Sequence, residues 1–343
     1  MDIKKIVIAS ESQHSWTPNI QKNLKEKQIE QMRQYLPTPG QISGVVHSIS
    51  NAASRKGIDV EYLVIDDLES SMEKIRFSLG QGVCVWILSD GHIFNYSSRL
   101  CSWLKLMGVK IFGSDSMIQG LTDNKYLMSL VAKENGILVP SSYLYKSKKL
   151  ISSMTCKDFD QGFFVKPNCL GSQIGISGES RTATMDDAIY ISEMIYEEYG
   201  VESIIQSYIP GSDHRICTIN IDDQFYLSCL KVKVKTNEGS KIDFSTNRTI
   251  HGRTWEFTEA PYDSQSYTTA KKTVSTLEKL GLIRDYAGID IRGTDENGYM
   301  FIENNVKPFP DNSFKTLSSL IDSRDIGEIF LKSIISSCKN QFQ

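Results

Sequence analysis

The chain has 343 residues, of which 40% are hydrophobic and 23% charged, with a formal net charge of -3 and a pI near 6.0. This balance is typical of a soluble globular protein and gives no electrostatic reason to expect nucleic acid or an anionic membrane as a partner. The length exceeds that of one compact core, so we expect two or three subdomains. No apolar run is long enough to span a membrane, no signal-peptide core follows the N-terminus, and the seven cysteines form no C-x-x-C pair. We therefore expect a cytoplasmic protein without a disulfide framework or a zinc ribbon.

The first third alternates short apolar runs with helical stretches. Predicted strands cover 5–9, 60–65, 83–88 and 109–112, and predicted helices cover 42–55, 71–79 and 97–107. This alternation predicts a parallel sheet covered on both faces. Ligands of such sheets bind beyond the carboxyl ends of the strands, here 10–15 and 89–92. The charged segment 18–40 predicts an inserted helix that stops at Pro-Thr-Pro-Gly, as a surface helix or as a lid.

A second unit begins near Gly120. A helix is predicted from Lys125 to Asn135, with Asp123-Asn124 as its cap. A buried strand then leads through Lys166 into a turn with Gly171 and Gly175. The backbone N–H groups of such a turn can bind phosphate, and Lys166 could reach the same phosphates. The turn is equally compatible with an ordinary hairpin.

The strand 203–206 leads into a turn that could present backbone groups to a purine, with Asp213 placed for ribose hydroxyls. A hairpin is predicted over 216–221 and 226–234. Its alternation sends Lys231 and Lys233 to one face, either as a solvated surface or as cations that neutralise a triphosphate. The polar segment 236–261 predicts a loop, and a helix follows over 266–280.

A second hairpin is predicted from strands at 287–291 and 299–302. Strand alternation places Asp290 on one face, and puts Glu303 and Asn305 on a common side of the partner strand. Two carboxylates and a carboxamide are hard oxygen donors, which suit Mg²⁺ or Mn²⁺. Solvated acids on a polar hairpin are the alternative.

Taken in order, these motifs resemble the ATP-grasp superfamily, and within it the D-alanine:D-alanine ligase-like branch. The matching motifs are Thr122-Asp123-Asn124-Lys125, Phe164 to Ile176, Gln206 to Asp213, and Asp290 with Glu303-x-Asn305. The resemblance covers 104–314 and implies an α/β ATP-grasp fold with three parts. These are an N-terminal parallel α/β domain at 1–120, a central α+β subdomain at 121–205 and a C-terminal α+β subdomain at 206–343, with ATP held between the last two.

The resemblance also implies roles for individual residues. The metal site would hold two Mg²⁺ ions on Asp290, Glu303 and Asn305. ATP would contact the following residues: Lys125, Lys166, Gly171, Ser172, Gln173, Gly175, Gln206, Ser207, Tyr208, Ile209 and Asp213, with Lys231 and Lys233 as further cations. The family resemblance further suggests a homodimer.

One departure affects the predicted substrate. Ligases of this branch carry arginine two residues before the first metal aspartate, where this chain has Gly288. We therefore expect a retained nucleotide site and a rebuilt amino-acid site, with the substrate carboxylate held by Arg292, Arg253 or Arg248 and the acyl phosphate covered by the loop containing Ser172. The predicted function is an ADP-forming, ATP-dependent ligase that joins amino-acid or peptide substrates through an acyl phosphate. A D-alanine or other D-residue ligase of cell-wall synthesis is one alternative, and a non-catalytic nucleotide-binding protein is the other.

Overall fold

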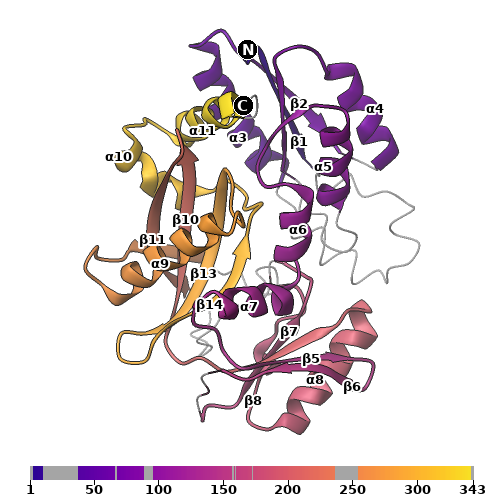
Figure 1. Cartoon of the computed structure of the whole chain (residues 1–343), viewed down its shortest axis with the longest axis vertical. Coiled ribbons are helices and arrows are strands. Elements are labelled where there is room, and N and C mark those ends of the chain that lie inside the picture. Colours follow the sequence, from indigo (N-terminus) through magenta and orange to yellow (C-terminus); the bar gives the residue numbers. More distant parts are fainter. Residues whose placement is uncertain are drawn as a thin grey trace.

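The structure is a computed structural model that describes residues 3–10, 38–65, 68–88, 96–156, 158, 160–171, 173–235 and 254–340. The strands of these residues form three sheets, which follow one another along the long axis of the molecule (Figure 1). The first and third sheets lie within the predicted parts 1–120 and 206–343, whereas the central sheet runs two residues past 205, because its strand β9 covers Ser203–Ser207. The boundaries themselves stay a proposal, because helices pack across them.

The N-terminal sheet is parallel, as predicted, with the order β2-β1-β3-β4. Its strands are β1 (Lys5–Ser10), β2 (Asp59–Val64), β3 (Val83–Ile87) and β4 (Lys110–Phe112). Its helices are α3 (Pro39–Ser54), α4 (Leu68–Ser78) and α5 (Tyr96–Leu106). Of the predicted inserted helix at 18–40, residues 18–37 lie outside the described residues.

The Thr38-Pro39-Gly40 part of the Pro-Thr-Pro-Gly sequence begins helix α3, and the predicted helix that would stop at this sequence lies outside the described residues. Thr38 is the N-cap of α3, its hydroxyl accepts from the Gln41 backbone N–H at 3.2 Å, and the Gln41 side chain accepts from the Thr38 N–H at 2.8 Å. Pro39 fits the first turn because that turn needs no backbone donor there. The same residues therefore begin the next helix.

The central sheet is antiparallel, with the order β6-β5-β9-β7-β8. Its strands are β5 (Ser142–Lys146), β6 (Lys149–Met154), β7 (Phe163–Pro167), β8 (Arg181–Thr182) and β9 (Ser203–Ser207), with η1 (Gly178–Ser180) before β8. Helix α8 (Met185–Tyr199) covers one face of this sheet and forms a small core of its own with it. Two further helices, α6 (Ser116–Thr122) and α7 (Lys125–Glu134), connect the N-terminal and central sheets in sequence.

The third sheet is also antiparallel, with the order β12-β11-β10-β13-β14. Its strands are β10 (Ser212–Ile221), β11 (Gln224–Lys235), β12 (Thr254–Glu259), β13 (Tyr286–Thr294) and β14 (Gly298–Asn305). Helix α9 (Gln265–Lys279) covers one face, next to Ile216, Ile289 and Phe301. The prediction that 236–261 is all loop was wrong at β12, where Phe257 pairs with Val232 and extends the sheet.

The C-terminal segment returns to the N-terminal unit through η3 (Asn312–Leu317), α10 (Ser318–Ile321) and α11 (Ile326–Asn340). Helix α11 packs against α3 (Figure 1), and Phe330 stacks on Trp86 of β3 with ring centroids 5.0 Å apart. The Trp86 indole N–H donates to the Tyr286 hydroxyl at 2.9 Å. One buried cluster thus joins the N-terminal sheet to the third sheet. Among the described residues, no helix combines the length and apolarity needed to cross a bilayer.

Candidate active site

The hairpin of β13 and β14 places the two predicted metal-binding carboxylates directly opposite each other. Asp290 pairs with Glu303, and Gly288 pairs with Asn305, so these side chains share one face of the third sheet. The register shifts between Asp290 and Ile291, where Ile302 of β14 is an extra residue, and such a bulge often redirects side chains beside functional sites. The hairpin prediction is confirmed, whereas the metal role of the three residues stays a prediction.

Lys125, in the first turn of α7, links the central unit to this hairpin. Its ammonium group donates to the Leu170 carbonyl at 2.7 Å and lies 3.5 Å from a carboxylate oxygen of Glu303. The start of α7 is fixed, because Asn124 caps the helix and the Asn168 side-chain carbonyl accepts from the Tyr126 N–H at 2.9 Å. The lysine therefore comes to the site from a rigid helix end.

Asp123 does not share in the cap, contrary to the prediction that Asp123-Asn124 caps the helix together. Its two carboxylate oxygens lie 3.1 and 2.9 Å from the ammonium group of Lys307, which follows β14 and is buried. Asp123 and Lys307 thus form an ion pair between the start of α7 and the end of the hairpin.

Lys166, near the end of β7, is the second lysine at the site. It is 4% exposed, and its ammonium makes no hydrogen bond or ion pair with the described residues. Burial lowers the pKa of Lys166 to about 8, and repulsion from Lys125 adds to this, while attraction from Glu303 and Asp290 opposes it. A buried cation without a fixed partner is suited to an anionic ligand.

The two carboxylates have different environments. Burial raises the pKa of Asp290 despite the nearby Arg215. For Glu303 burial also disfavours the charge, but the lysines at 125 and 166 outweigh it and the pKa falls below its usual value. The charge of Glu303 is thus favoured by two lysines, of which only Lys125 pairs with it, and Asp290 contacts Arg215.

The donor set fits a divalent cation bound by oxygen. Asp290 and Glu303 are each 29% exposed, so ligands can reach them. The Asn305 carboxamide oxygen accepts from the Lys307 backbone N–H at 2.8 Å and keeps a second lone pair. No group of three His, Cys, Asp or Glu side chains that could bind a metal occurs among the described residues, so the third ligand would be this carboxamide.

The predicted phosphate-covering turn follows β7. Gln173 has a φ of 65° and Gly175 a φ of 73°, and a Cβ atom on Gly175 would lie 2.6 Å from the Pro167 ring. Glycine is therefore required at 175. Gly171 accepts from the Ile174 N–H at 3.1 Å. Ser172 lies outside the described residues, and phosphate binding by this turn stays a prediction.

The predicted adenine hinge runs from β9 into β10. The Gln206 amide donates to the Ser142 hydroxyl at 3.1 Å, the Ser207 N–H donates to the Ser141 carbonyl at 2.9 Å, and both hinge residues are buried. Gly211 closes the turn with a φ of 112°. These contacts fix the hinge at the end of β9, the middle strand of the central sheet, and its nucleotide contacts stay a prediction.

Arg292 braces this hinge. It donates through Nε to the Ile209 carbonyl at 2.7 Å and through Nη2 to the Tyr208 hydroxyl at 2.9 Å, and its Nη1 lies 2.8 Å from Asp213. The side chain is 6% exposed. These contacts give no support to a substrate-binding role for Arg292, which stays untested. The other two predicted carboxylate-binding residues, Arg248 and Arg253, lie outside the described residues.

The strand register places Lys231 and Lys233 on the opposite side of the third sheet from its acidic face, the face that carries Asp290 and Glu303. Lys231 pairs with His214, whereas Arg215, the next residue of β10, pairs with Asp290. Paired residues share a face, so both lysines leave the sheet on the α9 side. Their predicted role at the phosphates therefore gains no support from the sheet.

Sequence reasoning missed Arg215 and Lys307. The Arg215 Nε donates to a carboxylate oxygen of Asp290 at 3.2 Å, and Lys307 holds Asp123 as described above. Alternation along β10 does place Arg215 on the same face as Asp213, which was a usable signal. Its contact with Asp290 depends on which strands pair, and no local pattern shows that.

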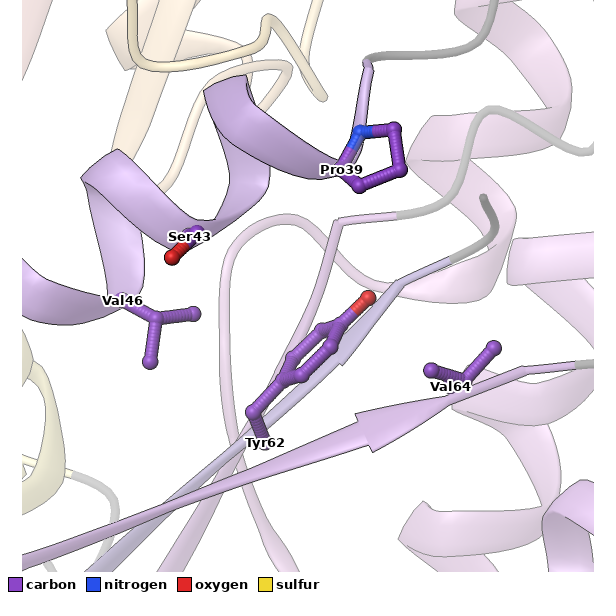
Figure 2. Close-up of a pocket in the computed structure, with 5 residues that line it drawn as sticks. All are labelled: Pro39, Ser43, Val46, Tyr62 and Val64. Atoms are coloured by element: carbon purple, nitrogen blue, oxygen red, sulfur yellow. The ribbon is translucent and has the colours of Figure 1, made fainter. Parts of the chain in front are cut away.

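A separate hollow of about 420 Å³ lies in the N-terminal unit. Figure 2 shows its lining, which comes from α3 and β2: Pro39, Ser43, Val46, Tyr62 and Val64. None of these residues belongs to the acidic face of the third sheet, so the hollow is not part of the candidate site.

Solved structures that superpose on this chain include ligases. The D-alanine–D-alanine ligase of Bacillus anthracis, solved with ATP, superposes with a TM-score of 0.66 and 15% identity, covering 99% of each chain. An L-amino acid ligase from Bacillus licheniformis superposes with a TM-score of 0.62 and 12% identity, covering 97% of this chain and 75% of that one. The chain has the ATP-grasp fold of these ligases.

Sequence comparison agrees with the ATP-grasp assignment. The D-alanine–D-alanine ligase of Flavobacterium johnsoniae is 28% identical over 208 residues, which are 59% of this chain and 58% of that protein. A ligase of the same name from Helicobacter pylori strain HPAG1 is 26% identical over 157 residues, covering 46% and 43%. The chain spans about half the length of the curated relatives it matches. No protein-family model matches it.

Proposed function

We propose that this ATP-grasp protein is an ADP-forming carboxylate–amine ligase acting on amino-acid or peptide substrates. One observation carries the proposal. Two buried lysines of the central unit, Lys125 and Lys166, face the paired carboxylates Asp290 and Glu303 of the third sheet. Cations and oxygen donors opposed in this way are what transfer of the γ-phosphoryl group of ATP requires.

The proposed reaction has two steps. A carboxylate oxygen of the first substrate attacks the γ-phosphorus, and the bond from that phosphorus to the bridging oxygen breaks, so ADP leaves and an acyl phosphate forms. The nitrogen of a neutral amine then attacks the acyl carbon, the bond from carbon to the phosphate oxygen breaks, and the amine gives up one proton as phosphate leaves.

The residues of the candidate site suit these steps without a general base. Lys125 and Lys166 would bind phosphoryl oxygens, and Lys166 gains the counter-charge that burial denies it. Asp290, Glu303 and Asn305 would hold Mg²⁺, which supplies charge neutralisation at the phosphates when bound. The turn at Gly171 to Gly175 would exclude water from the acyl phosphate.

The substrate is a separate question. The names of the relatives favour D-alanine. Ligases of the branch that this chain resembles carry arginine at the position of Gly288, and the glycine favours a rebuilt amino-acid site. We therefore propose specialised dipeptide or peptide synthesis over cell-wall synthesis. We further propose a cytosolic location, since all seven cysteines are unpaired, and a homodimer, which light scattering of the purified chain would test.

The test is an ATP-consumption screen with pooled L- and D-amino acids, with products identified by mass. We expect amino-acid-dependent phosphate release and a product heavier than either substrate. Measurable Mg-ATP binding without such release would favour the non-catalytic alternative over the ligase. Turnover with D-alanine alone would show that the proposed substrate preference is wrong.

A further inference from the structure

Arg215 occupies the centre of the acidic face, although no motif includes it. It lies on β10 and pairs with Asp290 of β13, which in turn pairs with Glu303 of β14. Three neighbouring strands therefore bring Arg215, Asp290 and Glu303 into one row across the sheet. Arg215 is a member of the candidate site by its position.

Among the described residues, only one of the three nitrogens of this guanidinium makes a hydrogen bond. Its Nε donates to Asp290 at 3.2 Å, and within the described part of the chain its two Nη groups make no hydrogen bond. The side chain is 31% exposed, so a ligand can reach those groups. Arg292 differs, because all three of its nitrogens contact the hinge. Arg215 thus presents a guanidinium that is oriented by one hydrogen bond and has its paired donors available.

The carboxylates around Arg215 are already engaged. Asp311 also attracts this guanidinium, but its carboxylate caps η3 by accepting from the Ser313 N–H at 2.8 Å. Glu303 pairs with Lys125. The surroundings thus hold Arg215 charged while leaving its Nη donors for an anion that arrives with the substrate.

The next pair of residues on this face, beyond Arg215 and Asp290, is covered. Cys217, two residues along β10, pairs with Gly288, which has no side chain. A Cβ atom at Gly288 would approach only Pro308, at 3.3 and 3.6 Å. Pro308 therefore covers Gly288, and Gly288 and Cys217 are both buried. A ligand thus reaches this face at Arg215, Asp290 and Glu303, whose side chains are 29–31% exposed.

We propose that Arg215 is a catalytic residue that binds the carboxylate to be activated and remains on its acyl oxygen as the phosphoryl group is transferred. A guanidinium with two parallel donors matches a carboxylate in a bidentate pair, and the same donors stabilise the oxyanion formed when the amine attacks. The inference rests on the proposed ligase function for its chemistry. Carboxylate binding by Arg215 can be tested without it.

The first experiment measures binding rather than turnover. Wild type, Arg215→Lys and Arg215→Gln are dialysed to equilibrium with Mg²⁺ and a non-hydrolysable ATP analogue against a pool of L- and D-amino acids, or against the matched pool of amino-acid amides. Retained compounds are identified by mass. We expect wild type to retain at least one amino acid but not its amide, Arg215→Gln to lose this retention at least tenfold, and Arg215→Lys to fall between them.

A second readout separates direct binding from mere positioning of Asp290. If Arg215 contacts the substrate, the Mg²⁺ concentration that gives half-maximal binding of the ATP analogue changes less than threefold in Arg215→Gln. In Arg215→Ala, added guanidinium chloride should restore retention, whereas the exposed-site variant Arg55→Ala should show no dependence on guanidinium.

Several outcomes would overturn the inference. Three of them concern retention: equal retention by wild type and Arg215→Gln, retention of amides as well as amino acids, or no retention by wild type. The fourth is an Arg215→Gln variant whose only change is a tenfold rise in the Mg²⁺ requirement. Arg215-dependent retention without any ATP-dependent product would instead support carboxylate binding and refute the ligase function. The two failures are therefore distinguishable.

Discussion

Lys166 is a residue whose burial disfavours the folded state at the pH values where the lysine is charged. It is buried, burial lowers its pKa to about 8, and Lys125 repels it. An unfolded lysine titrates near its usual pKa of about 10.4. Between about pH 8 and that value the unfolded chain binds the proton that the folded chain has lost, so Lys166 makes stability rise with pH across this window.

Lys166→Met should therefore stabilise the free protein while removing ATP binding. We expect a gain of about 1 to 3 kcal/mol in the free energy of unfolding at pH 7, and loss of the rise in stability above pH 8. Urea unfolding at pH 7 and pH 9.5, together with titration of an ATP analogue, measures both effects. The exposed-site variant Lys149→Met should change neither. A less stable Lys166→Met variant, or one that still binds ATP, would contradict this account.

Glu303 should control the Mg²⁺ requirement of the proposed site. Glu303→Gln keeps the shape of the side chain but removes the charge that would bind metal and that holds Lys125 at 3.5 Å. We expect the Mg²⁺ concentration for half-maximal activity, or for binding of an ATP analogue, to rise at least tenfold. An unchanged requirement would show that Glu303 is not a metal ligand.

At the scale of elements, the link from the hinge to β10 depends on close contact between two backbones. Gly211 has a φ of 112°, and a Cβ atom there would lie 2.0 Å from the Gly293 carbonyl oxygen of β13. The close approach lets Arg292 of β13 reach the Ile209 carbonyl of the hinge. The turn therefore connects the central sheet to the third sheet at the predicted adenine hinge.

Gly211→Ala should be more damaging than an alanine at another left-handed glycine. Gly57 has a φ of 66° with no atom within 4 Å of its Cβ position, so Gly57→Ala measures backbone strain alone, about 1 kcal/mol. Gly211→Ala adds a steric conflict with backbone, and we expect about 3 kcal/mol or more, with weaker binding of an ATP analogue. Equal losses in urea unfolding would show that the turn relaxes without cost.

Elements and site residues differ in how far the sequence could specify them. The β13–β14 hairpin was predictable, because a polar turn between two alternating strands determines, from nearby residues alone, that Asp290 and Glu303 lie on the same face. The contact of Arg215 with Asp290 was not, because it depends on the pairing of β10 with β13 across a long sequence separation. Lys231 shows the same limit, since alternation aligned the lysines but did not show which face α9 covers.

At the scale of the whole molecule, buried clusters cross the boundaries between sheets. Trp86 and Phe112 of the first sheet share a core with Tyr286 of the third sheet and Phe330 of α11. The central sheet and α8 have a small core of their own. The first and third sheets should therefore unfold as one cooperative unit.

The contact between α3 and α11 offers a test of that cooperativity. A Cβ atom at Gly327 would lie 2.3 Å from the Ser48 backbone, whereas Gly44 on α3 has open space. Gly327→Ala should lower the melting temperature by several degrees and shift the signals of both sheets together. Gly44→Ala should raise it slightly, because alanine favours a helix interior. Separate transitions for the two sheets in Gly327→Ala would refute the shared unit.

The position of α11 at the end of the chain also means that the first sheet is synthesised before the helix that covers it. The strands of the first sheet are made early by the ribosome, yet Phe330, Ile329 and Ile334, which cover its core, are made only after both later sheets. Until then the apolar surface around Ile49 and Trp86 has no cover from this helix. The nascent N-terminal unit should therefore depend on chaperones, and ribosome-stalled chains that lack residues 326–340 should be digested by protease in a region that is resistant in the released protein.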